Sequence, residues 1–107
     1  MFSNFQPITI TKRAAEEVKK IMNTKGIPTE YCLRIGVKGG GCGVSLLVGF
    51  DKPKETDQKF IINQIPVIID KKHTMYVIGK EMDYLQTEQG QGFSFIQQND
   101  INTQTES

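Results

Sequence analysis

The residue with the clearest chemical potential is Cys42, which lies in a segment dominated by glycine. Residues 38–43 read Lys-Gly-Gly-Gly-Cys-Gly, so four of these six residues are glycine. A glycine backbone tolerates positive φ angles and lets a ligand approach closely. A thiol in such a segment could act as a nucleophile, as a redox-active group, or as a ligand for a soft metal or an iron–sulfur cluster.

Other interpretations of this loop fit the sequence less well. A phosphate-binding loop is followed by a helix and usually ends in Gly-Lys-Ser/Thr, whereas here a strand pattern follows and that ending is missing. A nucleophilic cysteine needs a base, and the only histidine, His73, falls in the polar first turn of a predicted short helix, where we interpret it as a solvated surface residue. An inert, buried cysteine is common in proteins, but a glycine-rich loop is a poor place to bury one. The roles that remain for Cys42 are therefore ligation of a metal or a cluster, and redox chemistry.

The second cysteine, Cys32, is predicted to lie too far away to join Cys42. Six extended residues separate Cys32 from Lys38, which corresponds to about 20 Å at the usual rise of a strand. A disulfide requires α-carbons within about 7 Å, so the two thiols are not expected to be bonded or to share one metal. We interpret Cys32 as structural, and any cluster would draw further ligands from a second chain, a partner protein or a small thiol.

Two alternating patterns flank the glycine segment and predict the element that carries Cys42. Apolar residues alternate over 31–37 and again over 44–50. Alternation of this kind is typical of strands with one buried face, and two such runs around a glycine loop predict a β-hairpin. Cys42 is expected at its tip.

A helix is predicted before the hairpin, over residues 11–22. Thr11 is a plausible N-cap, and Gly26 and Pro28 end the segment. Its apolar positions follow a 3.6-residue period and form one face. They are Ala14, Ala15, Val18, Ile21 and Met22. We interpret its Lys/Glu face as a solvated surface.

Shorter elements are predicted after the hairpin. A charged turn over 51–57 precedes two short strands, 60–62 and 65–69, around Asn63-Gln64. Pro66 suits an edge position or the start of a strand because it lacks an N–H group. Asp70 is expected to cap a short helix that runs to about Ile78. Two more strands are predicted at 82–85 and 92–96, and residues 98–107 form a polar tail that we expect to be flexible.

The composition bounds the class of protein. The 107 residues make one domain, 1–107, without internal repeats, and 13 basic residues against 12 acidic ones leave a net charge of +1. This balance disfavours a nucleic acid or an anionic membrane as partner. No apolar run approaches the roughly 18 residues of a membrane span, and the first residues do not resemble a secretory signal. Two cysteines in such a chain are typical of a reducing compartment, so we expect a cytoplasmic protein.

Several of these segments together resemble the HesB/A-type iron–sulfur carrier family, the group of IscA and SufA. The resemblance spans residues 8–99, approximately, and rests on segments in matching order and spacing. They are Ile8-Thr9-Ile10-Thr11, Ala14-Ala15, Leu33-Arg34-Ile35-Gly36-Val37-Lys38, Gly41-Cys42-Gly43, Glu81-Met82-Asp83-Tyr84 and Gly92-Phe93-Ser94-Phe95.

The resemblance implies both a fold and a function. The implied fold is a β-rich α+β domain of two small mixed or antiparallel sheets, with a long N-terminal helix and a short second helix. The implied function is to accept an iron–sulfur cluster, [2Fe–2S] or [4Fe–4S], or iron, from an assembly scaffold and pass it to apo-proteins. The cargo would lie between protomers of a homodimer or tetramer. Cys42 would be a ligand, with Gly41 and Gly43 beside it.

The chain departs from the family at the remaining ligands. Members of the family carry two further cysteines in a Cys-Gly-Cys near the C-terminus, whereas residues 97–107 contain no cysteine. Two protomers would supply two Cys42 thiolates, half of a four-thiolate set. We therefore expect cluster binding by this chain to be weak, dependent on a partner, or absent.

Three hypotheses about the function remain. The first is a non-enzymatic carrier or accessory factor of iron–sulfur cluster assembly that uses Cys42 of two subunits. The second is an interaction module of the same fold that has lost metal binding. In the third, Cys42 is a redox thiol that condenses with glutathione or a partner thiol. No catalytic constellation in the sequence argues for a turnover enzyme.

Overall fold

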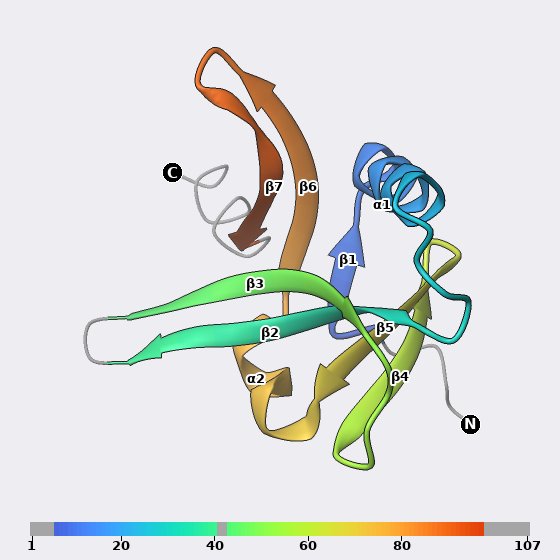
Figure 1. Ribbon diagram of the computed structural model, residues 1–107. Helices are drawn as coiled ribbons and strands as arrows, with labels where there is room; N and C mark the ends of the chain where they lie inside the picture. The colour runs from blue at the N-terminus through green and yellow to red at the C-terminus, as the bar shows by residue number, and fades with distance from the viewer. Residues whose placement is uncertain (1–5, 41–42, 98–107) are drawn as a thin grey trace.

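The computed structural model describes residues 6–40 and 43–97 and shows two small β-sheets with one long helix (Figure 1). A four-stranded sheet has the strand order β3-β2-β5-β4, and a three-stranded sheet has the order β1-β6-β7. Both sheets contain parallel and antiparallel pairs. The predicted β-rich α+β architecture, with its long N-terminal helix and short second helix, is confirmed. The flexible tail predicted at 98–107 lies outside the described residues.

Helix α1, Lys12–Thr24, begins and packs as its sequence predicts. Thr11 is the N-cap, and its hydroxyl accepts a hydrogen bond from the Ala14 N–H at 3.2 Å. Ala14, Ala15 and Val18 are buried, whereas the charged side chains of the helix are exposed except for Glu17, which is partly buried. A single apolar face therefore holds the helix against the sheets, where it contacts β5 and β6.

The four-stranded sheet is built from two hairpins joined side by side. Strands β2, Cys32–Gly40, and β3, Gly43–Asp51, are antiparallel, as are β4, Asp57–Ile62, and β5, Ile65–Asp70. A parallel contact between β2 and β5 joins the two hairpins. The β4–β5 turn places Asn63 and Gln64 at φ angles of 51° and 72°, which is the conformation that two-residue hairpin turns favour.

Pro66 was predicted to lie either in an edge strand or at the start of a strand, and the structure shows the second. It lies in β5, an interior strand, as the second residue after the turn. The pairing of β5 with β2 begins at the next residue, Val67, which pairs with Leu33. Pro66 therefore occupies the start of a strand, where its missing N–H costs no ladder hydrogen bond.

The three-stranded sheet joins the first of the described strands to the last two. Strand β1, Ile8–Ile10, runs parallel to β6, Lys80–Thr87, and β6 pairs antiparallel with β7, Gly90–Gln97. The strands β6 and β7 are longer than the predicted 82–85 and 92–96. Strand β1 was not predicted, because three residues are too few to show an alternating pattern.

The predicted short helix consists of two pieces. Asp70 caps a 3₁₀ turn η1, Lys71–His73, by accepting a hydrogen bond from the Lys72 N–H, and α2, Thr74–Val77, follows. His73 is partly buried rather than fully solvated as we expected. Val77 of α2 is completely buried in the core.

One core joins the helix and both sheets. Its buried side chains come from α1, α2 and strands of each sheet, and they are almost all aliphatic. The main contributors are Ile8, Val18, Ile35, Val67, Val77 and Met82. None of the described helices is long and apolar enough to cross a membrane.

Candidate functional site

The glycine segment stands at the end of the long β2–β3 hairpin, which extends away from the rest of the molecule (Figure 1). The ladder starts at the pair Cys32–Asp51 and continues without a bulge to Gly40–Gly43. This corrects one expectation, because residues 38–40 and Gly43 belong to the paired strands instead of a loop. Regular hydrogen bonding extends this far because glycine can be accommodated in a strand, even though it weakens one.

Of the three predicted site residues, the structure describes one. Gly43 is the first residue of β3 and pairs with Gly40. Gly41 and Cys42 lie outside the described residues. Next to the tip, Gly39 has a φ angle of 132°, which L side chains rarely adopt, so this position requires glycine.

Cys32 lies at the opposite end of the hairpin from Gly40, as predicted. Eight residue steps separate them along β2, which corresponds to about 26 Å at 3.3 Å per residue. The side chain of Cys32 is a free thiol and is buried. Within residues 6–40 and 43–97, no group of three or more His, Cys, Asp or Glu side chains is arranged to hold a metal ion. Cys32 is thus a small buried side chain at the hairpin's base.

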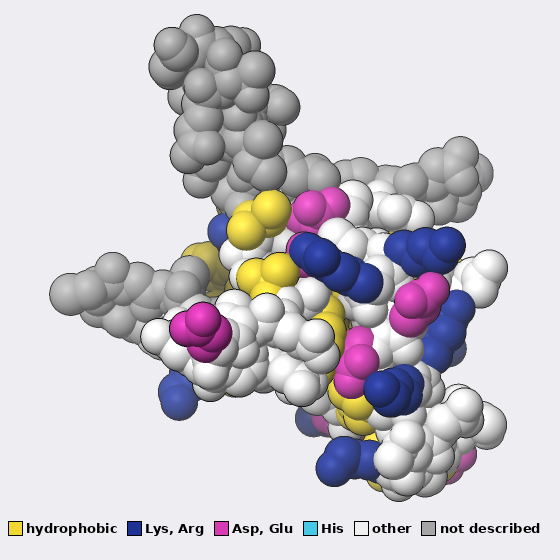
Figure 2. Space-filling model, turned by 90° about the horizontal axis from the view of Figure 1, so that it is seen from above, with side chains coloured by type: hydrophobic (Ala, Val, Ile, Leu, Met, Phe, Trp, Pro, Cys, Tyr) yellow, Lys and Arg dark blue, Asp and Glu magenta, His cyan; other side chains and the backbone are white. Residues whose placement is uncertain are grey.

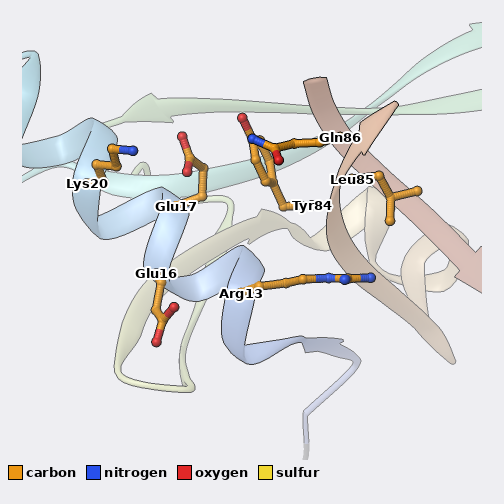
Figure 3. Close-up of a pocket in the computed structure, with 7 residues that line it drawn as sticks. All are labelled: Arg13, Glu16, Glu17, Lys20, Tyr84, Leu85 and Gln86. Carbon is orange, nitrogen blue, oxygen red and sulfur yellow. The ribbon is translucent and has the colours of Figure 1, made fainter. Parts of the chain in front are cut away.

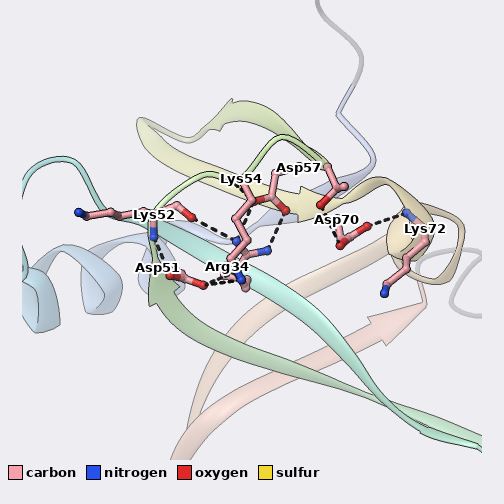
Figure 4. A network of polar contacts seen from close by, with 8 residues as sticks. Arg34, Asp51, Lys52, Lys54, Asp57, Asp70 and Lys72 are labelled. Atoms are coloured by element: carbon pink, nitrogen blue, oxygen red, sulfur yellow. Dashed lines mark hydrogen bonds and ion pairs between the residues drawn. The ribbon is translucent and has the colours of Figure 1, made fainter.

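Arg34 holds the base of the hairpin, a role that no local pattern in the sequence predicted (Figure 4). The guanidinium of Arg34, in β2, donates to both carboxylate oxygens of Asp57 at 2.8 and 2.7 Å, and to Asp51 at 3.0 Å. The Asp57 side chain is only 1% exposed. These charge-assisted hydrogen bonds tie β2 to both ends of the 51–57 turn and fix the orientation of the hairpin.

A second polar cluster joins the start of α1 to β6. Asp83 accepts hydrogen bonds from the Thr11 hydroxyl at 2.7 Å, from the Arg13 guanidinium at 2.7 and 2.6 Å, and from the Tyr84 N–H at 2.8 Å. The hydroxyl that caps α1 is therefore itself oriented by a residue 72 positions away. The segment containing Asp83 thus has a structural role in this fold.

In both polar clusters the hydrogen-bond partners stabilise the ionised form of the aspartate. Hydrogen bonding to Arg13 is the largest cause that lowers the pKa of Asp83 far below its usual range. Hydrogen bonding to Arg34 likewise lowers the pKa of Asp57. A carboxylate that accepts several hydrogen bonds is stabilised in its ionised form. Both aspartates are therefore poor proton donors or acceptors near neutral pH, which argues for structural roles.

An open groove of about 520 Å³ lies between α1 and β6 (Figure 3). Its lining combines two basic and two acidic side chains from α1 with three residues of β6. They are Arg13, Glu16, Glu17, Lys20, Tyr84, Leu85 and Gln86. Burial and the neighbouring Glu17 raise the pKa of the Tyr84 phenol, which donates a hydrogen bond to Gln91 at 2.6 Å. The phenol is thus held as a neutral donor.

The charges on the surface follow the balanced composition. In the view from above, basic and acidic side chains are interspersed over the same face (Figure 2). A nucleic-acid-binding surface would concentrate basic side chains on one face. On this face, neither positive nor negative charge is concentrated enough to favour a partner of the opposite charge.

The sequence is similar to proteins of iron–sulfur cluster assembly. A family model described as iron-sulphur cluster biosynthesis matches residues 6–104. The chain is 39% identical over 97 residues to the uncharacterized protein SufA of Bacillus subtilis, covering 89% of this chain and 80% of that protein. It is 37% identical over 98 residues to the mitochondrial iron–sulfur cluster assembly 1 homolog of Dictyostelium discoideum, covering 89% and 70%.

The fold is also found among solved structures. The crystal structure of Escherichia coli SufA, involved in biosynthesis of iron–sulfur clusters, superposes with a TM-score of 0.70 at 22% identity and covers 89% of this chain and 85% of that one. The crystal structure of IscA with the [2Fe–2S] cluster gives a TM-score of 0.68 at 22% identity and covers 86% of each chain. At this identity the matches show the fold alone, and they confirm that it is HesB-like.

Proposed function

Because the chain belongs to the iron–sulphur cluster biosynthesis family, we propose that it is a carrier or accessory protein of cluster assembly that binds its cargo through Cys42. The match over residues 6–104 is the observation that carries the proposal. The cargo is iron or an iron–sulfur cluster, taken from an assembly scaffold and passed to apo-proteins. The balanced surface charge supports protein partners over nucleic acid or membrane.

The architecture of the hairpin supports this role. Its base is fixed by Arg34, and its distal end, Gly39–Gly40 with Gly43, is remote from the core. A ligand at the end of such an arm can meet a second protomer or a recipient protein without exposing the core. The reducing compartment predicted from the cysteine usage would keep Cys42 a thiol.

One chain does not provide a complete site for a cluster. Iron–sulfur clusters usually take four thiolates, and the only other thiol, Cys32, is buried at the far end of β2. We propose that two protomers contribute Cys42 and that glutathione or a partner protein completes the ligand set. Binding is therefore weak or partner-dependent, and transfer is stoichiometric rather than catalytic.

A second function rests on the same shortage of ligands. Since residues 97–107 contain no cysteine, the chain could serve as an interaction module of this fold that binds assembly partners without metal. Under this alternative, replacing Cys42 leaves partner binding unchanged.

Anaerobic reconstitution with iron and sulfide, with and without glutathione, tests the proposal. The wild type is compared with Cys42→Ala and with the matched control Cys32→Ala, which removes the buried thiol. We expect a thiolate-to-iron charge-transfer band in the wild type and in Cys32→Ala, strengthened by glutathione and lost in Cys42→Ala. If the wild type shows no band under either condition, carriage by this chain is refuted and the interaction module is favoured.

A further inference from the structure

Strand β6 is paired along its whole length on one side and only partly on the other. On one side, β7 pairs with all eight of its residues. On the other side, β1 pairs with residues 80–82 only. The Thr11 N–H then donates to the Met82 carbonyl at 3.0 Å, and the chain enters α1. In the described part of the chain, residues 83–87 therefore have no strand beside them on this side.

The β6–β7 register shows which backbone groups this open edge presents. Thr87 and Gly90 pair across a two-residue turn, so they exchange both backbone hydrogen bonds, and hydrogen-bonded pairs then alternate along the ladder. Tyr84 and Gln86 fall at the intervening positions, so their backbone N–H and C=O groups point away from β7. Met82 belongs to the same set, and its carbonyl accepts the bond that ends the ladder with β1.

One of these backbone groups already has a partner. The Tyr84 N–H donates to the Asp83 carboxylate at 2.8 Å. The Tyr84 carbonyl and both backbone groups of Gln86 remain directed along the open edge. An antiparallel segment placed there would exchange two hydrogen bonds with Gln86 and donate a third to the Tyr84 carbonyl. The edge therefore matches the backbone of one short added strand.

The groove between α1 and β6 lies along this same part of β6 (Figure 3). Its other wall is a single stripe of α1 with the spacing i, i+3, i+4 and i+7, which places side chains on one face of a helix. The stripe consists of Arg13, Glu16, Glu17 and Lys20. Seven residue steps of helix cover about 10 Å, which is the length of about three residues of extended chain. Peptides that add a strand to an exposed sheet edge bind in such an extended form.

The charges of the α1 stripe indicate which kind of segment fits the groove. Arg13 is compensated by its ion pair with Asp83 at 2.6 Å, and no other ion pair among the described residues includes a residue of the groove. This leaves the carboxylates of Glu16 and Glu17 against the single amine of Lys20. A basic side chain in the groove is therefore favoured over an acidic one.

The pleat of β6 determines where the side chains of an added strand would lie. The side chains of Tyr84 and Gln86 are on the side of β6 that faces Glu17, and Leu85 points the other way (Figure 3). Residues directly opposite each other in neighbouring strands share a face. The two residues opposite Tyr84 and Gln86 would therefore face α1, and the residue between them would lie beside Leu85, which is 39% exposed. The matching pattern is basic, apolar, basic.

We propose that the groove between α1 and β6 binds an extended segment of a partner protein, which adds a strand to β6 at residues 84–86 and carries Lys or Arg on both sides of an apolar residue. Residues 1–5 and 98–107 of this chain contain no lysine or arginine, so they do not supply this pattern. The groove is separate from the proposed cargo site, since binding there needs neither metal nor Cys42.

NMR titration of the isotope-labelled, metal-free Cys42→Ala chain tests the proposal, because neither a cluster nor this thiol can then contribute. The probe is the peptide Ser-Thr-Lys-Val-Lys-Thr-Ser, blocked at both ends. One comparison peptide has glutamate in place of both lysines, and another is methylated on the backbone nitrogens of both lysines. We expect the probe to shift the amide resonances of residues 13–20 and 84–87. Both comparison peptides should bind about tenfold more weakly, because they lose charge complementarity or two backbone hydrogen bonds.

Two pairs of protein variants locate the site. Gln86→Pro removes the N–H donor of the open edge but no bond to β7, and it should weaken binding about tenfold, whereas Gln86→Ala should bind as the parent does. Glu16→Lys should weaken binding of the basic probe about fivefold. The matched control is Glu55→Lys, an equal change of charge at an exposed position in the turn between β3 and β4, which should have no effect.

The outcomes that overturn the proposal are equally specific. They are the absence of shifts with the basic probe at millimolar concentration, equal affinity for the methylated peptide, and shifts confined to other parts of the protein. If Gln86→Pro does not fold, the methylated peptide still tests the same edge. Shifts of the groove residues with protein concentration alone would assign the groove to a second copy of the chain and would also overturn the proposal.

Discussion

Arg34 in β2 and Asp57 at the start of β4 form a bidentate ion pair across a strand that separates them. Strand β5 lies between β2 and β4 in the sheet, yet the guanidinium reaches both carboxylate oxygens at 2.8 and 2.7 Å. Ile68 of β5, which pairs with Arg34 and shares its face, is completely buried. The arginine side chain therefore links β2 to β4 and passes over β5, which lies between these two strands.

Replacing Arg34 by Met is expected to lower the free energy of unfolding by about 3 kcal/mol, because the nearly buried Asp57 would lose the guanidinium that compensates its charge. Urea titration at neutral pH measures the effect. The control is Lys54→Met, which removes an exposed amine 3.8 Å from Asp51 and should cost less than about 1 kcal/mol. Equal losses in the two variants would contradict the role assigned to Arg34.

The lowered pKa of Asp83 predicts a stability that depends on pH. A carboxyl whose pKa is lower in the folded state stabilises the fold above its unfolded pKa of about 3.9, and this contribution is lost as the pH falls toward the folded value. The wild type should therefore be more stable than Asp83→Asn at pH 6, with the difference shrinking below about pH 4. Urea titrations across this range measure it, and a constant difference would argue against the lowered pKa.

Gly39 should be the glycine of β2 that tolerates substitution least. Its φ of 132° strains any L side chain, so Gly39→Ala is expected to cost about 1–3 kcal/mol. Gly36→Ala is the control in the same strand, since its φ is not positive and a Cβ there meets nothing within 4 Å. It should be neutral or slightly stabilising. Thermal unfolding of both variants and the wild type measures these changes. Equal losses of stability in the two variants would contradict the backbone strain expected at position 39.

Gln64→Gly is expected to stabilise the protein by about 1 kcal/mol. Gln64 has a φ of 72° in the β4–β5 turn, where left-handed geometry costs an L residue roughly 1–2 kcal/mol and glycine much less. The loss of its exposed hydrogen bond from Lys19 should offset little of this.

Asn63→Gly provides the comparison for the turn. Asn63 also has a positive φ, but its side-chain amide donates to the Ile10 carbonyl at 3.1 Å. The same substitution there should gain less or destabilise, since it removes a link to β1. If both variants shift the denaturation midpoint equally, the effect depends on backbone geometry alone and the Asn63 hydrogen bond contributes nothing to stability.

Local structure was predictable from the sequence because its signals lie close together along the chain. The period of Ala14, Val18 and Ile21 predicts α1, and alternating residues around the glycines predict the β2–β3 hairpin. Thr11 and Asp70 predict the caps, since a capping side chain bonds to a backbone N–H only a few residues away. The resemblance to the HesB family was carried instead by short motifs in matching order and spacing, among them Gly41-Cys42-Gly43 and Glu81-Met82-Asp83-Tyr84.

The tertiary structure decided which of these segments meet. Strand β1 needs β6 beside it to be a strand, Asp83 completes the Thr11 cap from 72 residues away, and Arg34 finds Asp57 across an intervening strand. No local pattern encodes such contacts, because they depend on how buried faces pack together. The position of β3 at one side of the four-stranded sheet is likewise a property of strand order, which only the assembled sheet defines.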